Sequence, residues 1–250
     1  MAGLSGGALG GDVPAEATQD ALFGGSVVLF QPPRGAGYRT NVDALLLAGF
    51  ATSAHAAPVA FDLGAGVGAV GLALLRLGAA RRAVLVEIDE QPAAMARRNL
   101  DANGWTDRGE VVRADVRDVA RSRRGEAALV VCNPPYVAPG RGRVPIAQSR
   151  ARCGELATFV RAARQVAGRR ARVCFVYPAQ ELTALLTAFM SEGLHAKRMR
   201  FVHGTPAAPA RVVLVEALAG RAGGLAVMPP LVERGARGYT PEMQALLARG

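Results

Sequence analysis

The chain has 250 residues, 50% of them hydrophobic, and a formal net charge of +10 at pH 7, so it is long and apolar enough to bury one large core. Its cysteines, Cys132, Cys153 and Cys174, show no paired spacing and no nearby histidine cluster, which argues against a disulfide framework and against a metal site. No stretch has the pattern of a signal peptide or a membrane span, so we expect a soluble, cytoplasmic protein that does not bind a membrane.

Strands and helices are predicted to alternate from about residue 58 onward. Strands are expected at 59–64, 81–89, 109–116, 126–135 and 172–178, and helices at 68–80, 91–104 and 154–167. This order predicts an α/β fold with a parallel, doubly wound sheet covered by helices on both faces. Two consecutive strands at 195–203 and 210–218 predict an antiparallel hairpin at one edge of the sheet.

The expected organisation is one domain with a short tail. We expect residues 1–19 to form a flexible tail and residues 20–250 a single domain. Within that domain, residues 20–57 form an N-terminal segment, residues 58–218 the core, and residues 219–250 a C-terminal extension.

A glycine-rich loop, DLGAGVGAVG, follows the first strand of the core, at the sheet edge where open α/β folds bind their ligands. Gly64, Gly66 and Gly68 permit tight turns and let backbone N–H groups approach a ligand closely. Gly66, Gly68 and Gly71 also satisfy the dinucleotide pattern G-x-G-x-x-G, so a nicotinamide-dependent oxidoreductase is an alternative, and a simple connecting turn is the plainest interpretation.

Three acidic residues stand at successive strand ends. Glu87 is placed to accept hydrogen bonds from ribose hydroxyls, and Asp115 from the amino group of an adenine. Asp62 favours a cationic amino group and would repel a pyrophosphate, which fits S-adenosylmethionine better than a dinucleotide. Any one of these acids alone could be a helix N-cap or a solvated turn.

The sequence Asn133-Pro134-Pro135-Tyr136 ends the fourth strand. The Asn133 side-chain carbonyl and the Pro134 main-chain carbonyl can each accept one N–H of a planar amino group, which aims its lone pair at a methyl donor. Pro135 fixes the turn, and the Tyr136 ring can stack on a base. The simpler interpretation is that the two prolines only stop a strand.

Together, the glycine loop, the three acids and N-P-P-Y resemble the class I S-adenosylmethionine-dependent methyltransferases that act on amino nitrogens. The flanking sequences GGSVVLFQPPRGAGYRTNVDALLLAGF and MPPLVERGARGYTPEMQALLARG are similar to those of bacterial tRNA1(Val) adenine-N6 methyltransferases. The resemblance implies a Rossmann-like, seven-stranded, mostly parallel sheet and an enzyme that methylates adenine N6 in tRNA.

The resemblance also assigns site residues. It implies that the N-terminal segment covers the cofactor through Arg39, Thr40 and Asp43. It also assigns to the cofactor the three glycines Gly64, Gly66 and Gly68, the three acids Asp62, Glu87 and Asp115, and their neighbours Ala65, Ile88 and Val116, together with Asn133. Separately, Arg141, Arg143, Arg150 and Arg152 fall in a segment expected to overhang the target pocket, where they could clamp RNA phosphates. A solvated arginine loop explains the same pattern.

Other functions stay open at this point. Val137, directly after the tyrosine, also occurs in the glutamine N5-methyltransferases that modify release factors, and the acceptor could equally be an amino group in rRNA or DNA. The residues before the glycine loop are too few for the separate helical domain usual in those glutamine-modifying enzymes. A non-catalytic RNA-binding relative with the same fold is the third class.

Overall fold

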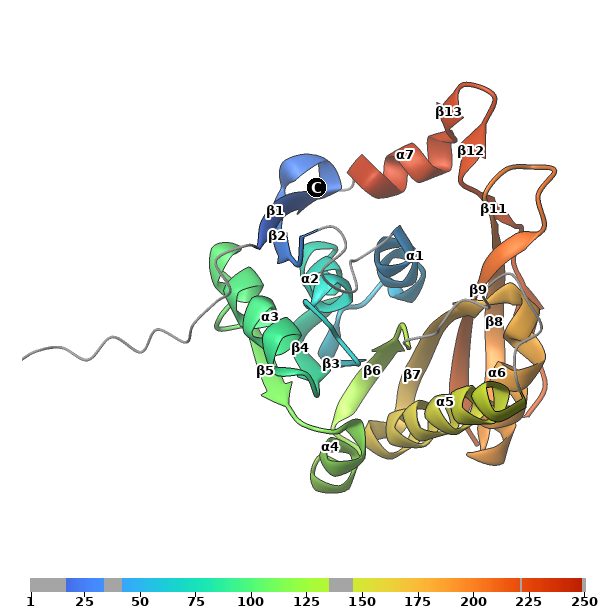
Figure 1. The fold of residues 1–250 in the computed structure, drawn as a ribbon. Helices are drawn as coiled ribbons and strands as arrows, with labels where there is room; N and C mark the ends of the chain where they lie inside the picture. Colours follow the sequence, from blue (N-terminus) through green and yellow to red (C-terminus); the bar gives the residue numbers. More distant parts are fainter. Residues whose placement is uncertain (1–16, 34–41, 135–145, 221, 249–250) are drawn as a thin grey trace, which may run out of the picture.

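The computed structural model describes residues 17–33, 42–134, 146–220 and 222–248, with the backbone alone for residues 146–154 (Figure 1). A central sheet runs through this part of the chain. Five of its strands are parallel neighbours in the order β5 (Gly109–Arg113), β4 (Ala80–Glu87), β3 (Ala57–Leu63), β6 (Ala127–Cys132) and β7 (Ala167–Pro178).

An antiparallel hairpin extends the sheet beyond β7, as predicted. β9 (Ala210–Ala219) pairs antiparallel with β7, and β8 (Leu194–His203) pairs antiparallel with β9. Two short strands that were not predicted, β10 (Ala226–Val227) and β11 (Leu231–Val232), pair parallel with β8 on its outer side. The sheet is therefore mostly parallel with an antiparallel hairpin near one edge, and its seven long strands are those of the expected fold.

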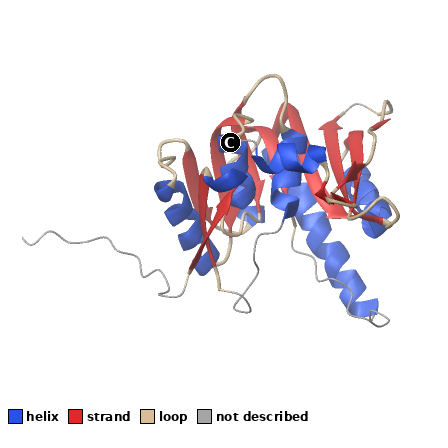
Figure 2. Cartoon of the chain, turned by 90° about the horizontal axis from the view of Figure 1, so that it is seen from above, coloured by secondary structure: helices blue, strands red, loops and turns tan. Residues whose placement is uncertain are grey.

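Helices cover both faces of the sheet. α1 (Val42–Ala51), α2 (Ala69–Arg76) and α3 (Glu90–Ala102) lie on one face, and α4 (Val116–Ser122), α5 (Ile146–Val166) and α6 (Leu182–Ser191) on the other (Figure 1). From above, the strands run through the middle of the molecule with helices around them (Figure 2). Apolar side chains fill both interfaces, so two separate clusters of buried residues flank the sheet.

The predicted helices at 68–80 and 91–104 correspond to α2 and α3, while the helix expected at 154–167 is longer and begins at Ile146. The elements α1, α4 and α6 are additional. Of the helices in the described ranges, none is both long and apolar enough to cross a membrane.

The two ends of the described chain pack against each other. Strands β1 (Thr18–Leu22) and β2 (Val27–Gln31) form an antiparallel hairpin around η1 (Phe23–Gly25). Helix α7 (Pro241–Ala248) contacts η1 and α1, and it comes so close that a Cβ at Gly49 would lie 2.6 Å from Leu246 Cδ1. Figure 1 shows α7 beside β1 and β2.

Three short elements complete the described chain: β12 (Arg234–Gly235) and β13 (Gly238–Tyr239) pair antiparallel with each other, and η2 (Ala179–Glu181) precedes α6. Strand β1 begins at Thr18, inside the segment 1–19 that was expected to be a tail, because its residues pair with β2; residues 1–16 lie outside the described part.

Candidate functional site

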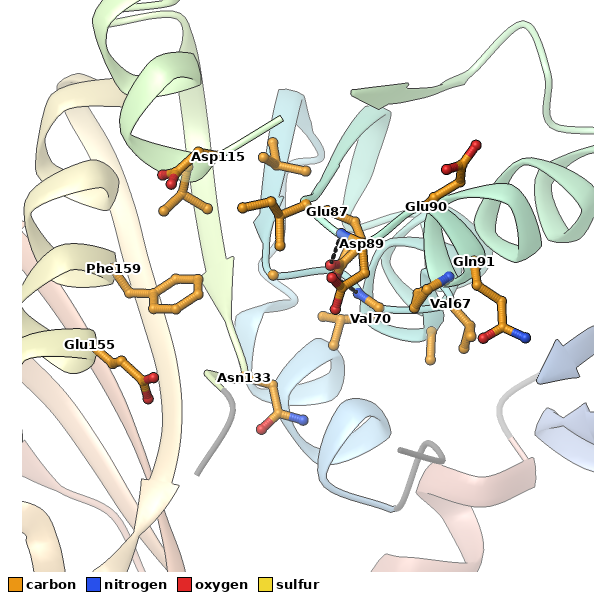
Figure 3. A pocket seen from close by; sticks show the side chains of 18 of the residues that line it. Val67, Val70, Glu87, Asp89, Glu90, Gln91, Asp115, Asn133, Glu155 and Phe159 are labelled. Atoms are coloured by element: carbon orange, nitrogen blue, oxygen red, sulfur yellow. Dashed lines mark hydrogen bonds between the residues drawn. The ribbon is translucent and has the colours of Figure 1, made fainter. Parts of the chain in front are cut away.

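A pocket of about 1080 Å³ opens at the carboxyl ends of β3, β4 and β6 (Figure 3). Its wall combines the glycine loop, the end of β4 with the start of α3, the start of α4, and one face of α5. The lining residues are Pro32, Ala44, Gly64, Ala65, Gly66, Val67, Ala69, Val70, Val86, Glu87, Ile88, Asp89, Glu90, Gln91, Pro92, Asp115, Val116, Arg117, Asn133, Glu155, Thr158 and Phe159.

The glycine loop has the tight turns that its sequence predicted, and its three glycines adopt a left-handed backbone. Gly64, Gly66 and Gly68 have φ angles of 72°, 55° and 86°, which residues with a Cβ rarely adopt. At Gly68 a Cβ would also come within 2.5 Å of Leu85 Cδ2 in the core. Glycine at these positions therefore permits both the turn and the close packing of the loop on β4.

Glu87 fastens the end of β4 to this loop. Its Oε2 accepts a hydrogen bond from the backbone N–H of Gly66 at 2.7 Å, and its Oε1 accepts one from Asp89 at 2.9 Å (Figure 3). Each carboxylate oxygen can accept more than one hydrogen bond. The group that holds the loop can thus still accept hydroxyl groups from a ligand in the pocket.

Asp62 lies beneath the loop and is absent from the pocket wall. Its side chain is 1% exposed, and its Oδ2 accepts a hydrogen bond from Gly71 at 2.9 Å. Burial raises the pKa of this carboxyl to about 7, and the nearby charge of Glu87 adds to that rise, although the Gly71 N–H opposes it. Its attraction of a cationic amino group in the pocket stays a prediction. The glycine loop would lie between the Asp62 carboxylate and that amino group.

Asp115 lines the pocket and also caps α4. Its Oδ1 accepts from the Arg117 backbone N–H at 2.8 Å, and the Arg117 guanidinium lies 2.5 Å from its Oδ2. The hydrogen bond from the Arg117 side chain lowers the pKa of Asp115. The capping role considered from the sequence is therefore present, and contact with an adenine stays a prediction.

Asn133 follows β6 and reaches the same pocket. In Figure 3 it lies between Glu155 and Val70, which also line the pocket. Pro134 is buried behind it, whereas Pro135 and Tyr136 lie outside the described residues. The first residue of the N-P-P-Y sequence is thus brought to the same pocket as the glycine loop.

Of the other predicted residues, Ala65, Ile88 and Val116 line the pocket, and the rest do not or lie outside the described residues and side chains. Asp43 is in α1 and 1% exposed, where its Oδ1 lies 2.6 Å from Arg211 Nη1, and the pocket wall beside it is formed by Ala44. The structure does not describe Arg39, Thr40, Arg141 and Arg143, and it describes only the backbone of Arg150 and Arg152.

Sequence comparisons agree on one class of enzyme. Residues 40–152 match the family model of the methyltransferase small domain. Two relatives are named tRNA1(Val) (adenine(37)-N6)-methyltransferase. The protein of Cronobacter sakazakii is 30% identical over 186 residues, which cover 70% of this chain and 74% of the relative. The protein of Pectobacterium carotovorum is 30% identical over 146 residues, which cover 57% of this chain and 58% of the relative. This chain belongs to the class I methyltransferases.

A solved structure agrees with that membership. The "predicted O-methyltransferase, protein Atu636" of Agrobacterium tumefaciens is 26% identical, with a TM-score of 0.67 over 82% of this chain and 95% of that one. The methyltransferase described here spans little more than half the length of the Pectobacterium relative, at 58%. Its cofactor is S-adenosylmethionine, and the glycine loop and the carboxylates of Glu87 and Asp115 line the pocket.

Several pocket residues of the methyltransferase were not predicted. Glu155, Thr158 and Phe159 share one face of α5 because they are spaced three and four residues apart. Phe159 lines the pocket where α5 packs against the glycine loop, since a Cβ at Gly64 would lie 3.0 Å from its ring. Their spacing was a usable signal, but nothing in it indicated that this face of α5 crosses the end of β3.

Ile88 was predicted, and its side chain is 58% exposed although it is a large apolar group. An exposed apolar side chain in a pocket wall can pack on the flat face of a ligand ring. In the described part of the chain, no three His, Cys, Asp or Glu side chains cluster closely enough to hold a metal ion.

Proposed function

We propose that this methyltransferase transfers a methyl group from S-adenosylmethionine to the exocyclic N6 of an adenine in tRNA. The single observation that carries the proposal is the position of Asn133, which begins Asn-Pro-Pro-Tyr and lines the cofactor pocket. The Cronobacter and Pectobacterium relatives are both named tRNA1(Val) (adenine(37)-N6)-methyltransferase, which supports the same substrate.

The chemistry must overcome the weak nucleophilicity of an exocyclic amino group, whose lone pair is delocalised into the ring. The cofactor supplies an electrophilic methyl on a sulfonium. Asn133 Oδ1 and the Pro134 carbonyl each accept one N–H of the target, which makes the nitrogen more pyramidal and holds its lone pair toward the methyl. A nitrogen–carbon bond forms as the sulfur–carbon bond breaks, and the nitrogen then releases one proton to solvent.

The cofactor is held, in this proposal, by groups on three adjacent strand ends. Glu87 accepts from the ribose hydroxyls, the loop of Gly64 to Gly68 lies along the amino acid part, and Asp115 faces the adenine. Ile88 and Phe159 supply apolar surface on the two sides of the pocket. Asp62 lies behind the loop, bonded to the Gly71 N–H, and a bound ammonium group would favour its ionised form over the protonated form that burial favours.

Replacement of Asn133 by Ala tests the mechanism. We expect kcat to fall by about 100-fold or more, the loss seen when one transition-state hydrogen-bonding group is removed. Cofactor affinity, measured by calorimetry, should change little, because the cofactor's own contacts remain. Activity of the variant within a few-fold of the wild type would contradict the role of Asn133.

The substrate is tested separately, by transfer of labelled methyl into unmodified tRNA, ribosomal RNA and release factor in parallel, followed by nucleoside analysis. Label recovered as N6-methyladenosine from tRNA supports the proposal. Label in the release factor would replace it by the glutamine N5 reaction, which belongs to enzymes in which Val137 also occurs. Thermal shift with NAD but not with S-adenosylmethionine would contradict both.

A further inference from the structure

The β12–β13 hairpin, defined here as residues 234–239, exposes two arginines and a tyrosine. The Arg234 guanidinium carbon lies 4.3 Å from the centre of the Tyr239 ring, and that side chain is 39% exposed although it is aromatic. Arg237 is exposed at the turn between the two strands. Across the described ranges, no carboxylate forms an ion pair with either arginine.

This hairpin is fixed to the end of β8. The backbone N–H groups of Glu233 and Arg234 donate to the carbonyls of His203 and Gly204 at 2.8 and 3.0 Å. On the other side, Thr240 N–H donates to the Glu233 carbonyl at 3.0 Å. The Glu233 carboxylate pairs with Arg211 at 2.5 Å. Because the base of the hairpin is held, its exposed side chains are presented with little cost in ordering entropy.

The hairpin follows the carboxyl end of a strand, as Asn133 does. β6, β7, β8 and β11 all run in one direction, so their carboxyl ends lie on the same side of the sheet. The path from β6 to β11 crosses β7, β9 and β8, which makes four steps of about 4.8 Å each, or about 19 Å. At a rise of about 3.4 Å per nucleotide, that distance corresponds to roughly six nucleotides of a helical strand.

The chemistry of the hairpin is that of a single-stranded or loop RNA contact. Arginine guanidinium groups neutralise phosphates, and a guanidinium stacked on an aromatic ring offers a flat surface to an unpaired base. The net charge of +10 adds long-range attraction for a polyanion. Arginine and tyrosine also anchor protein interfaces. Two arginines without a carboxylate partner, on a chain of net charge +10, favour a polyanion over a protein.

We propose that the β12–β13 hairpin binds the RNA substrate several nucleotides away from the methylated base. Arg234 and Arg237 contact phosphates, and the Arg234–Tyr239 pair stacks on an unpaired base. This inference rests on the proposed function, because it names a second contact of the same RNA, beyond β11, a strand about 19 Å across the sheet from β6.

The test compares the double variant R234A/R237A with the wild type in binding unmodified tRNA at several salt concentrations. Each lost phosphate contact should lower the slope of log affinity against log salt by about 0.7 to 0.9, so the double variant should lose about 1.4 to 1.8. Tyr239→Ala should weaken binding at least about fivefold with the slope unchanged, because it removes stacking and no charge. Cofactor affinity and kcat at saturating tRNA should stay at wild-type values.

Arg81 and Arg82 provide the matched control. Both are exposed and stand near the start of β4, at the opposite edge of the sheet. R81A/R82A removes the same charge as R234A/R237A. Because Arg81 and Arg82 lie away from the proposed RNA contact, this variant should leave the salt slope nearly unchanged. An equal loss in the two double variants would show that binding reports net charge alone, and would overturn the proposal.

The outcomes also separate this inference from the proposed function. If the wild type methylates tRNA and the hairpin variants bind tRNA as the wild type does, the hairpin contact is wrong and the function stands. If the wild type methylates no RNA but does methylate release factor, the proposed function fails, and the RNA contact fails with it. Melting temperatures of all variants guard against loss of folding as the cause of weak binding.

Discussion

At the residue scale, the site depends on a carboxyl group that the fold buries beneath the glycine loop. The pKa of Asp62 is raised to about 7, first by burial and further by the charge of Glu87. An unfolded aspartate releases its proton near pH 4. Between about pH 4 and pH 7 the unfolded state therefore binds fewer protons than the folded state, and the free energy of unfolding falls as pH rises.

We predict that Asp62→Asn removes this contribution in the cofactor-free protein. The amide is close in size and keeps an oxygen that can accept from the Gly71 N–H. The stability of the variant relative to the wild type should thus increase from pH 4 to pH 7 and level off above it, as measured by urea unfolding at several pH values.

Asp115→Asn is the control for that experiment, because the pKa of Asp115 is lowered. Stability from a lowered carboxyl pKa is complete above about pH 5 and is lost only as pH falls further. The difference between Asp115→Asn and the wild type should therefore be flat from about pH 5 to pH 7. A flat difference for Asp62→Asn as well would show that Asp62 does not keep its proton in the folded protein.

At the element scale, the side chains of Asn99 in α3 and of Asn103, which caps the end of α3, pair with β2 as a neighbouring strand would. Asn99 Oδ1 accepts from Phe30 N–H at 2.6 Å, and Asn99 Nδ2 donates to the Phe30 carbonyl at 2.9 Å. Asn103 makes the same pair of bonds with Val28. Asn99 alone also donates to the carbonyl of Val67 in the glycine loop, at 2.9 Å. It therefore connects the N-terminal hairpin to the cofactor pocket.

We predict that Asn99→Ala and Asn103→Ala each lower the free energy of unfolding by about 1 to 3 kcal/mol, because each leaves backbone groups of β2 unpaired. Only Asn99→Ala should also raise the Kd for S-adenosylmethionine by several-fold, since only it frees the glycine loop. Calorimetric titration of both variants measures this, and equal Kd values would refute a positioning role for Asn99.

These contacts also show which features of the fold a local sequence pattern can and cannot predict. Buried parallel strands are continuous apolar runs, so the strands and the acids at their ends, Asp62 and Glu87, could be placed from the sequence. Hairpin β1–β2 could not, because β2 is held partly by amides about seventy residues away. Phe159 is a pocket residue only because α5 crosses the glycine loop, which is a property of packing rather than of local pattern.

At the scale of the whole molecule, one ion-pair chain joins segments from the beginning, middle and end of the described chain. Arg211 on β9 lies between Asp43 of α1 and Glu233 beyond β11, at 2.6 and 2.5 Å. Together with the packing of Leu246 against Gly49, this contact ties the C-terminal extension to the helix that borders the pocket. We propose on this basis that residues 20–250 unfold as one cooperative unit.

Arg211→Leu tests this proposal, because it removes the cation beside a carboxylate that is only 1% exposed. Loss of one partner of a buried pair costs about 3 to 5 kcal/mol, and we expect the lower end because Arg211 is 35% exposed and partly screened by water. The control Arg161→Leu breaks the surface pair with Glu192 and should cost less than about 1 kcal/mol. If the chain is one unit, Arg211→Leu shifts a single unfolding transition seen alike by fluorescence of Trp105 and by circular dichroism. A second transition confined to one probe would mean that the N- and C-terminal segments separate from the core before it unfolds.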